Sequence, residues 1–276
     1  METIHTVAEL RARLDREASI ALVPTMGNLH AGHIALVEAA RRHAKCVVAS
    51  IFVNRLQFEP GGDFDRYPRT IATDGEMLER AGCDVVFAPE EREMYPKPQE
   101  IVVAPPKAAA QLCGDFRPGH FQGVVTVVAK LFNIVRPDAA VFGKKDFQQL
   151  FVIRELVKQL NFGIEIVGVK TVREGDGLAL SSRNSYLTGV ERSKAVRLYQ
   201  NLKRIKEMVE GGRRDFDALA RAAVEDLTSA GWKVDYVALR NRSALAAPAN
   251  GDRDLVVLGA AWLGTTRLID NLEIEG

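Results

Sequence analysis

Short apolar segments alternate with helical patterns through the first two-thirds of this 276-residue chain, and this alternation limits the fold more than any other feature. The longest apolar run, residues 46–53, is typical of a parallel strand that is covered on both faces. Strands that alternate with helices predict parallel strand–helix–strand units joined by right-handed crossovers. We therefore predict an α/β fold built on a parallel sheet.

The positions of the predicted elements point to a single site. Strands are predicted over residues 20–23, 46–53, 84–88, 139–142 and 164–169, and helices over 32–44, 70–81, 122–135 and 146–160. Ligands bind such sheets at the carboxyl ends of the strands. His30, Asn54, Gly143 and Lys170 all fall at or just past predicted strand ends. The sequence therefore predicts one site along one edge of the sheet.

The pattern changes near residues 175–177, Gly-Asp-Gly. Beyond them it is typical of a small α+β unit, with helices predicted over 189–210 and 215–230 and strands over 233–239, 254–261 and 266–272. We place the boundary within residues 176–186, which divides the chain into domains of residues 1–180 and 181–276.

Composition excludes several classes of protein. A formal net charge of +1 predicts no nucleic-acid or membrane partner held by bulk charge, and no apolar run is long enough to span a bilayer. Glu2 and Glu9 interrupt any signal-peptide pattern. The cysteines Cys46, Cys83 and Cys113 are odd in number and widely spaced, which predicts buried free thiols and a cytoplasmic protein. No cluster has the spacing of a protein metal site.

The stretch His30-Ala31-Gly32-His33 lies where the first strand gives way to a helix, with Gly27 just before it. Glycine lets a ligand approach the backbone, and a helix N-terminus favours anions. The two imidazoles share one helical face. These features predict a polyphosphate site suited to nucleotidyl transfer. The alternative is that one histidine caps the helix and the other is an ordinary residue.

Two further clusters follow predicted strands. Residues 52–58 carry Asn54 and Gln57, whose amides both donate and accept and therefore suit a small hydroxy acid, although a simple turn is the alternative. Residues 142–149 place Lys145 where it can meet phosphate oxygens, and a solvated charge pair at a helix start is the alternative.

The last cluster, residues 178–185, combines Ser181, Ser182 and Arg183 on a loop that follows a glycine. Hydroxyl donors beside an arginine predict a second phosphate clamp, and turn chemistry at a domain linker is the alternative. Residues 117–121 are predicted to form a loop that serves as a lid.

Six stretches, in this order, resemble one family over nearly the whole chain: PTMGNLHAGH, FVNRLQF, YPRT, CGDFRPGHFQGV, FGKKDFQQL and LALSSRNSYL. They are similar to the pantoate–β-alanine ligases (pantothenate synthetases) of the HxGH nucleotidylyltransferase superfamily. The resemblance implies ATP-dependent joining of (R)-pantoate to β-alanine through pantoyl adenylate, with AMP and pyrophosphate released and Mg²⁺ required. It also implies a Rossmann-like N-terminal domain, a C-terminal α+β lid domain and a homodimer.

Matching positions in the motifs carry the implied roles. His33 matches the assigned general acid and His30 its phosphate-contacting partner, while Gln57 and Gln149 match pantoate ligands, and Asn54 and Gln57 contacts to β-alanine. Lys145 and Arg183 complete the implied catalytic set. The resemblance places ATP along Met26, Gly27, Asn28, Leu29, His30, Ala31, Gly32 and His33, along Gly143, Lys144, Lys145 and Asp146, at Val172, and along Leu180, Ser181, Ser182 and Arg183.

Three positions depart from the family pattern. Arg55 stands where many members have proline, Lys144 where Glu or Gln is common, and Thr73 precedes Asp74 where some members have paired acids. We therefore assign no protein metal ligand and expect ATP phosphates to hold most of the Mg²⁺ shell. Two alternatives remain open: another HxGH adenylyltransferase, and a nucleotide-binding regulator without catalysis.

Overall fold

The computed structural model describes residues 1–59, 61–62, 64–249 and 251–275, and the chain divides into two compact units. Unit 1 comprises Met1–Lys144 and Val152–Lys170, and unit 2 comprises Lys145–Phe151 and Thr171–Gly276. The short segment Lys145–Phe151 thus belongs with the C-terminal part of the chain, although unit 1 surrounds it in sequence. The predicted domains, residues 1–180 and 181–276, stay a prediction.

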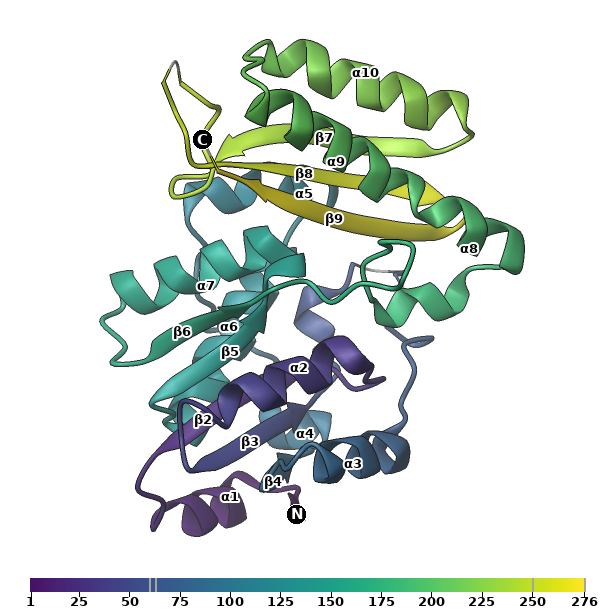
Figure 1. The fold of residues 1–276 in the computed structure, drawn as a ribbon. Coiled ribbons are helices and arrows are strands. Elements are labelled where there is room, and N and C mark those ends of the chain that lie inside the picture. The colour runs from purple at the N-terminus through teal and green to yellow at the C-terminus, as the bar shows by residue number, and fades with distance from the viewer. Residues whose placement is uncertain (60, 63, 250, 276) are drawn as a thin grey trace. The chain divides into compact units, whose positions relative to one another are not determined.

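Unit 1 is built on a parallel sheet, which confirms the predicted fold class (Figure 1). Within the described residues the sheet has six strands in the order β1-β4-β3-β2-β5-β6. In chain order they are β1 (Glu2–Ile4), β2 (Ile20–Thr25), β3 (Cys46–Ile51), β4 (Val85–Phe87), β5 (Ala139–Gly143) and β6 (Glu165–Val169). The predicted strands at 20–23, 46–53, 84–88, 139–142 and 164–169 all form.

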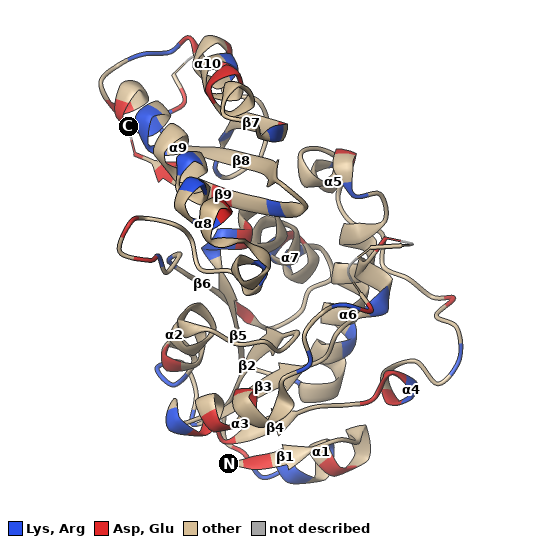
Figure 2. Ribbon diagram, turned by 90° about the vertical axis from the view of Figure 1, so that its right-hand side faces the viewer, with Lys and Arg blue, Asp and Glu red and all other residues tan. Residues whose placement is uncertain are grey.

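Helices cover both faces of this sheet, as the continuous apolar strands require. Figures 1 and 2 show α2 on one face of the sheet and α6 on the other. Val23, Val47 and Val141 of the sheet pack with Val37 of α2 in one buried cluster. The helices are α1 (Val7–Leu14), α2 (Ala31–Ala40), α3 (Ile71–Arg80), α4 (Glu91–Met94), α5 (Cys113–Phe116), α6 (His120–Val135) and α7 (Phe147–Gln159), with 3₁₀ turns η1 (Arg55–Gln57), η2 (Lys107–Ala110) and η3 (Lys144–Asp146).

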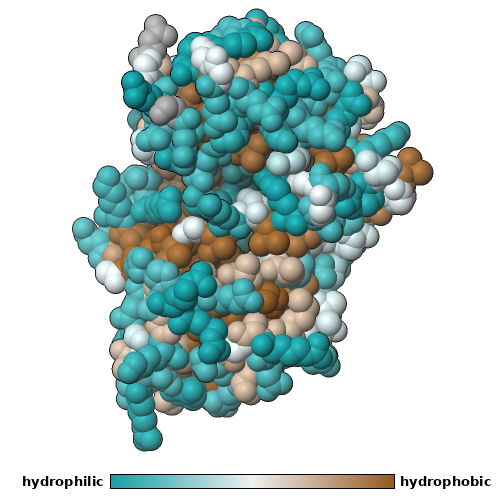
Figure 3. Space-filling model, viewed as in Figure 1, coloured by the Kyte–Doolittle hydropathy of each residue, from teal (hydrophilic) through white to brown (hydrophobic). Residues whose placement is uncertain are grey.

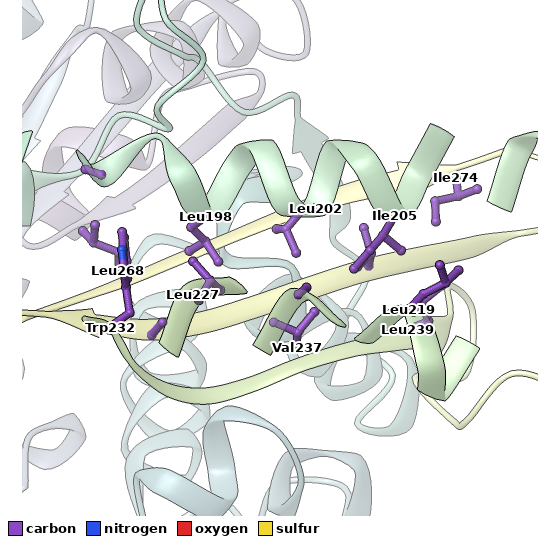
Figure 4. Packing of buried hydrophobic residues seen from close by; sticks show 14 of the residues in the cluster. Leu198, Leu202, Ile205, Leu219, Leu227, Trp232, Val237, Leu239, Leu268 and Ile274 are labelled. Atoms are coloured by element: carbon purple, nitrogen blue, oxygen red, sulfur yellow. The ribbon is translucent and has the colours of Figure 1, made fainter. Parts of the chain in front are cut away.

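Unit 2 carries an antiparallel sheet in the order β7-β8-β9, which confirms the predicted α+β pattern. Leu198, Leu202 and Ile205 extend from one helix onto this sheet, and Leu227 and Trp232 complete the buried cluster (Figure 4). The elements are η4 (Ser182–Tyr186), α8 (Gly189–Ala195), α9 (Arg197–Glu210), α10 (Phe216–Ser229), β7 (Lys233–Asn241), β8 (Leu255–Leu263) and β9 (Thr266–Ile274).

Three features differ from the sequence analysis. The predicted helix 189–210 is two helices that part at Val196, whose backbone N–H turns back to the Lys194 carbonyl. The predicted loop 117–121 is wrong at its end, because His120 and Phe121 already form the first turn of α6. Strand β1 and helix α1 were not predicted, although Thr6 with Glu9 is a recognisable N-cap pattern.

Acidic and basic side chains are interspersed along the helices, as Figure 2 shows for α1 and α10. In α10, Asp226 receives two hydrogen bonds from Arg197, at 2.7 and 2.8 Å, and one from Asn201 at 2.7 Å. In the part of the chain that the structure describes, no helix combines the length and apolar character needed to cross a membrane.

Leu202 tests the core of unit 2, because its side chain is fully buried between α9 and the antiparallel sheet. We expect Leu202→Ala to lower the free energy of unfolding by about 2–5 kcal/mol through lost burial and the cavity left behind. Denaturant unfolding measures this change. Leu160→Ala is the control, since that side chain is 52% exposed, and an equal loss in both variants would contradict the packing.

Asp226 makes the stability of the fold depend on pH. Its hydrogen bonds from Arg197, and then from Asn201, lower the pKa of the carboxyl from 3.8 to about 2. A lowered pKa stabilises the fold above the unfolded value, and that stability is lost as pH falls through the folded value. We expect Asp226→Asn to cost about 1 kcal/mol at neutral pH, with the deficit shrinking between about pH 4 and pH 2. Glu225→Gln, at an exposed position of the same helix, should show no such convergence in thermal melts.

Candidate active site

The loop after β2, Met26–His33, turns sharply before it enters α2. Gly27 has φ +80° and Asn28 has φ +50°, a left-handed conformation that glycine and asparagine tolerate. A Cβ on Gly27 would lie 2.9 Å from Asp74 Oδ2 and 3.1 Å from Ile51 Cγ2. Both the backbone angle and the crowding therefore require glycine at the start of this loop.

Asp74, which lies on α3, fixes the shape of the loop that follows β2. Its carboxylate accepts hydrogen bonds from the backbone N–H of Asn28 at 2.9 Å, of Leu29 at 2.9 Å, and from the Thr70 hydroxyl at 3.0 Å. The side chain is buried, with 1% of the residue exposed. Sequence analysis considered Asp74 only as a metal ligand. The signal it missed is a carboxylate on the buried face of a helix, one turn before the fully buried Leu78.

The two histidines of the loop are held by backbone groups at the start of α2. Gly32 N–H donates to His30 Nδ1 at 3.1 Å, and His30 N–H donates to His33 Nδ1 at 3.3 Å. The rings lie side by side, with centroids 4.1 Å apart. Because Nδ1 accepts in both rings, each neutral ring carries its proton on Nε2. His30 thus caps the helix, as the alternative given in the sequence analysis expected of one histidine. Each ring carries its N–H on Nε2.

The predicted substrate amides lie beside this loop in unit 1. Asn54 follows β3 and is buried, and its Nδ2 donates to Gln57 Oε1 at 3.2 Å. Gln57 Nε2 in turn lies 2.9 Å from Met26 Sδ, the first position of the predicted ATP loop. The structure therefore brings Asn54, Gln57 and Met26 together. The sequence analysis placed Asn54 at this edge of the sheet because it follows a strand, and Met26 and Gln57 through the family resemblance.

His120 and Gly123 of α6 hold the backbone of this amide turn, where the sequence analysis predicted only a lid loop over residues 117–121. His120 Nδ1 donates to the Gln57 carbonyl at 2.9 Å, while Arg117 approaches His120 Nε2 at 3.1 Å. Gly123 lets α6 approach η1, because a Cβ there would lie 2.2 Å from the Leu56 carbonyl oxygen. His120 is thus neutral and structural, since one ring nitrogen donates and the other accepts.

The remaining predicted residues lie elsewhere in the two units. Gly143 ends β5 and Lys144 begins η3, both in unit 1, where β5 pairs with β2. Lys145, Asp146 and Gln149 belong to unit 2. There the Asn271 side chain of β9 donates to the Lys145 carbonyl at 2.8 Å, a contact that sequence gave no means of finding.

The second predicted phosphate clamp is an ordered loop of unit 2. Leu180 N–H donates to the Val172 carbonyl at 3.0 Å, which brings these two predicted ATP contacts together. Ser181 caps η4 by accepting from the Arg183 N–H at 3.2 Å, and Ser182 begins that turn. The hydroxyl of Ser181 therefore shapes the loop. This agrees with the alternative given in the sequence analysis, in which these hydroxyls form a turn at a domain linker.

The side chains present do not form a protein metal centre. Within the described residues, no group of three or more His, Cys, Asp or Glu side chains is placed to hold a metal ion. Asp74 accepts three hydrogen bonds, which leaves its oxygens occupied by the loop and Thr70. The three cysteines are buried, and burial raises the pKa of Cys46 and Cys83 to about 11.

A parallel α/β sheet with an HxGH loop at the carboxyl end of a central strand defines a nucleotide-binding enzyme of the nucleotidylyltransferase type. Comparison with known proteins identifies the family. The model of the pantoate-beta-alanine ligase family matches residues 2–273. Pantothenate synthetase of Nitrosospira multiformis is 57% identical over 274 residues, which cover 99% of this chain and 98% of that protein.

Solved structures agree with this match. Pantothenate synthetase from Thermus thermophilus superposes with a TM-score of 0.95 at 47% identity, covering 100% of both chains. The ligase from Francisella tularensis, solved in complex with beta-gamma ATP and beta-alanine, has a TM-score of 0.84 at 32% identity and covers 99% of this chain and 97% of its own. The chain belongs to the pantoate–β-alanine ligase family, whose known reaction is ATP-dependent condensation of pantoate with β-alanine. It is therefore an acid–amine ligase of pantothenate biosynthesis.

Asp74 can be tested separately from the rest of the site. Asp74→Asn keeps the size of the side chain but replaces one acceptor oxygen by an N–H₂ group, which opposes a backbone N–H. We expect a loss of about 1–3 kcal/mol in stability and a rise of about tenfold in KM for ATP. Steady-state kinetics and thermal melts measure both. Glu76→Gln, exposed on the same helix, should change neither, and an unchanged KM in Asp74→Asn would contradict the role of Asp74 in shaping the loop.

Proposed function

We propose that this chain performs the ligase reaction in two steps, in which the HxGH loop and the Asn54–Gln57 amides of unit 1 bind ATP and pantoate, and the Lys145 and Ser181–Arg183 segments of unit 2 contribute phosphate contacts. The observation that carries the proposal is the contact of Gln57 Nε2 with Met26 Sδ at 2.9 Å. It joins the predicted pantoate-binding amide to the first residue of the predicted ATP loop. A carboxylate bound at Gln57 would therefore lie beside a nucleotide bound along that loop.

In the first step the pantoate carboxylate attacks the α-phosphorus of ATP in line, and pyrophosphate leaves. The products are pantoyl adenylate, a mixed anhydride, and pyrophosphate. Lys145, Arg183 and the hydroxyls of Ser181 and Ser182 supply donors and positive charge to the phosphate oxygens. Gln57 and Gln149 hold the pantoate. Activation is needed because a carboxylate is a poor acyl donor.

The histidines act in this step as hydrogen-bond donors. Both rings accept a backbone N–H at Nδ1, which supports a neutral state with the ring proton on Nε2. A neutral donor stabilises the charge that develops on the departing pyrophosphate. We favour this role over general-acid catalysis by His33, and a flat pH–rate profile across the range where histidine titrates is the expected result.

In the second step the β-alanine amine attacks the acyl carbon of the adenylate. The new C–N bond forms, the bond to the AMP oxygen breaks, and the amine loses its proton. Asn54 and Gln57 orient the amine for this attack. The intermediate must be shielded from water, and closure of a C-terminal lid domain, residues 181–276, would provide that shield over the nucleotide domain, residues 1–180.

ATP is a substrate, in line with the nucleotide complex of the Francisella relative. We propose that Mg²⁺ is bound mainly by the ATP phosphates. Within the described residues no cluster of side chains could hold the ion, and the Asp74 carboxylate accepts hydrogen bonds from the loop. The residues described here do not fit a protein-held metal, so no step is assigned to one.

A homodimer and a cytoplasmic location belong to the same proposal. The edge strand β6 pairs only with β5 among the described strands, and its Ile166, Val167 and Val169 stay partly exposed. Figure 3 shows apolar side chains gathered on the face where Figure 1 draws β6. An apolar edge of this kind supports coverage by a second copy. The buried thiols of Cys46 and Cys83 support a reducing compartment.

The deciding experiment separates the two steps. Pyrophosphate release is measured with ATP and pantoate alone, and AMP release after β-alanine is added. We expect pyrophosphate with pantoate alone and AMP only after the amine. Nucleotide binding without pyrophosphate release would refute the adenylate route and direct the search to other acids. No turnover with any acid would leave a nucleotide-binding regulator.

Lys145 gives the sharpest single-residue test. We expect Lys145→Ala to slow pyrophosphate release about 10²–10³-fold, the scale for losing one donor to a developing charge. Pre-steady-state kinetics of the first step measures this rate. Lys158→Ala, exposed on α7, is the matched control and should leave the rate unchanged. A first-step rate equal to that of the unaltered enzyme in Lys145→Ala would remove Lys145 from the mechanism.

A further inference from the structure

Tyr95, immediately after α4, reaches the substrate amides although no motif of the sequence pointed to it. Its hydroxyl donates to Asn54 Oδ1 at 2.8 Å. The ring is fixed by its neighbours, with the Phe52 ring at 5.9 Å and Lys130 Nζ 5.0 Å above its centroid. The phenol is thereby placed to orient the buried amide of Asn54.

The direction of each hydrogen bond in this group follows from one backbone carbonyl. Asn54 Nδ2 lies 3.2 Å from the Gly123 carbonyl oxygen, which can only accept. The N–H₂ group of Asn54 must therefore face Gly123, and its Oδ1 must face Tyr95. The Tyr95 O–H is consequently the donor of that pair.

The same reasoning fixes the direction of the hydrogen bond between Asn54 and Gln57. The second N–H of Asn54 points to Gln57 Oε1 at 3.2 Å, so that this oxygen is engaged as an acceptor. The amide of Gln57 then presents its Nε2 donors toward Met26 Sδ. A thioether is a weak acceptor, and a carboxylate or hydroxyl oxygen of a substrate would bind these donors far more strongly.

We propose that Tyr95 is a positioning residue for the ligase reaction: through Asn54 it sets the amide of Gln57 so that N–H donors, not a carbonyl oxygen, face the substrate. Without the phenol, the carbonyl oxygen of Asn54 loses its donor, and Asn54 is held through its N–H₂ group alone. The hold of Asn54 on Gln57 Oε1 then weakens, and the Gln57 amide can rotate by 180°. A rotated Gln57 would turn an oxygen toward the substrate carboxylate and repel it. The inference rests on the proposed roles of Asn54 and Gln57.

The state of the phenol agrees with this role. Burial, and after it the charge of Glu91, raise the pKa of Tyr95 well above its usual value. The hydroxyl therefore keeps its proton and remains a donor at any pH where the enzyme works. The orientation of the Asn54 and Gln57 amides is therefore independent of pH.

Kinetics of Tyr95→Phe test the proposal, because phenylalanine keeps the ring and removes only the O–H. We expect KM for pantoate and β-alanine to rise about three- to tenfold, the range of one net hydrogen bond, with KM for ATP and the thermal midpoint nearly unchanged. Tyr199→Phe, which removes the hydroxyl of a ring stacked on Arg173 in unit 2, is the control and should leave all three KM values as they are.

A double-mutant cycle separates positioning from general structural support. If Tyr95 acts through Gln57, Tyr95→Phe should add no further increase of KM when Gln57 is already alanine. Additive effects in the double variant would overturn the proposal, as would an unchanged KM for both substrates in Tyr95→Phe.

A spectroscopic readout tests the same hydrogen bonds without turnover. In ¹⁵N-labelled protein without substrates, Tyr95→Phe should shift and broaden the side-chain amide signals of both Asn54 and Gln57, and Tyr199→Phe should not. Unchanged signals would overturn the proposal whatever the activity. Shifted signals in a protein that releases no pyrophosphate with pantoate would keep the hydrogen-bond order and refute the proposed reaction instead.

Discussion

A single buried carboxylate, that of Asp74, shapes the loop between β2 and α2 that carries the HxGH histidines. Two consecutive backbone N–H groups, those of Asn28 and Leu29, donate to its two oxygens. Neither group belongs to a helix or strand, so without Asp74 both would need water or a ligand. The left-handed turn at Gly27 brings the backbone within reach of this carboxylate, and the turn in turn places His30 at the start of α2. The histidines are consequently presented by a rigid strand–turn–helix connection.

The same logic of fixed donors and acceptors extends to the neighbouring amides. Gly123 lets two backbones meet where any side chain would intrude, and its carbonyl then dictates how Asn54 must face. His120 and Asn54 each have a defined donor and acceptor side because backbone carbonyls leave no choice. Polar side chains in this part of unit 1 thus derive their orientation from main-chain groups, which move less than side chains do.

The sequence predicted the sheet because burial on both faces leaves an unbroken apolar signal, as in residues 46–53. It did not predict the break at Val196, since no glycine or proline interrupts the helical pattern there. The place of Asn54 was predictable from a strand end, and the places of Met26 and Gln57 from the family resemblance. The contacts of Tyr95 and Gly123 with Asn54, and of Asn271 with Lys145, were not predictable, because each joins residues distant in sequence.

The hydrogen bond from Asn271 to Lys145 has a consequence for dissecting the molecule. The chain passes between the two units after residues 144, 151 and 170. Lys145 therefore begins a short segment, Lys145–Phe151, that belongs to the C-terminal unit. A fragment that ends at residue 180 would retain the lysine and lose the strand that holds its carbonyl. Expressing residues 1–180 alone would therefore yield a protein in which the Lys145 carbonyl has lost its hydrogen bond from Asn271.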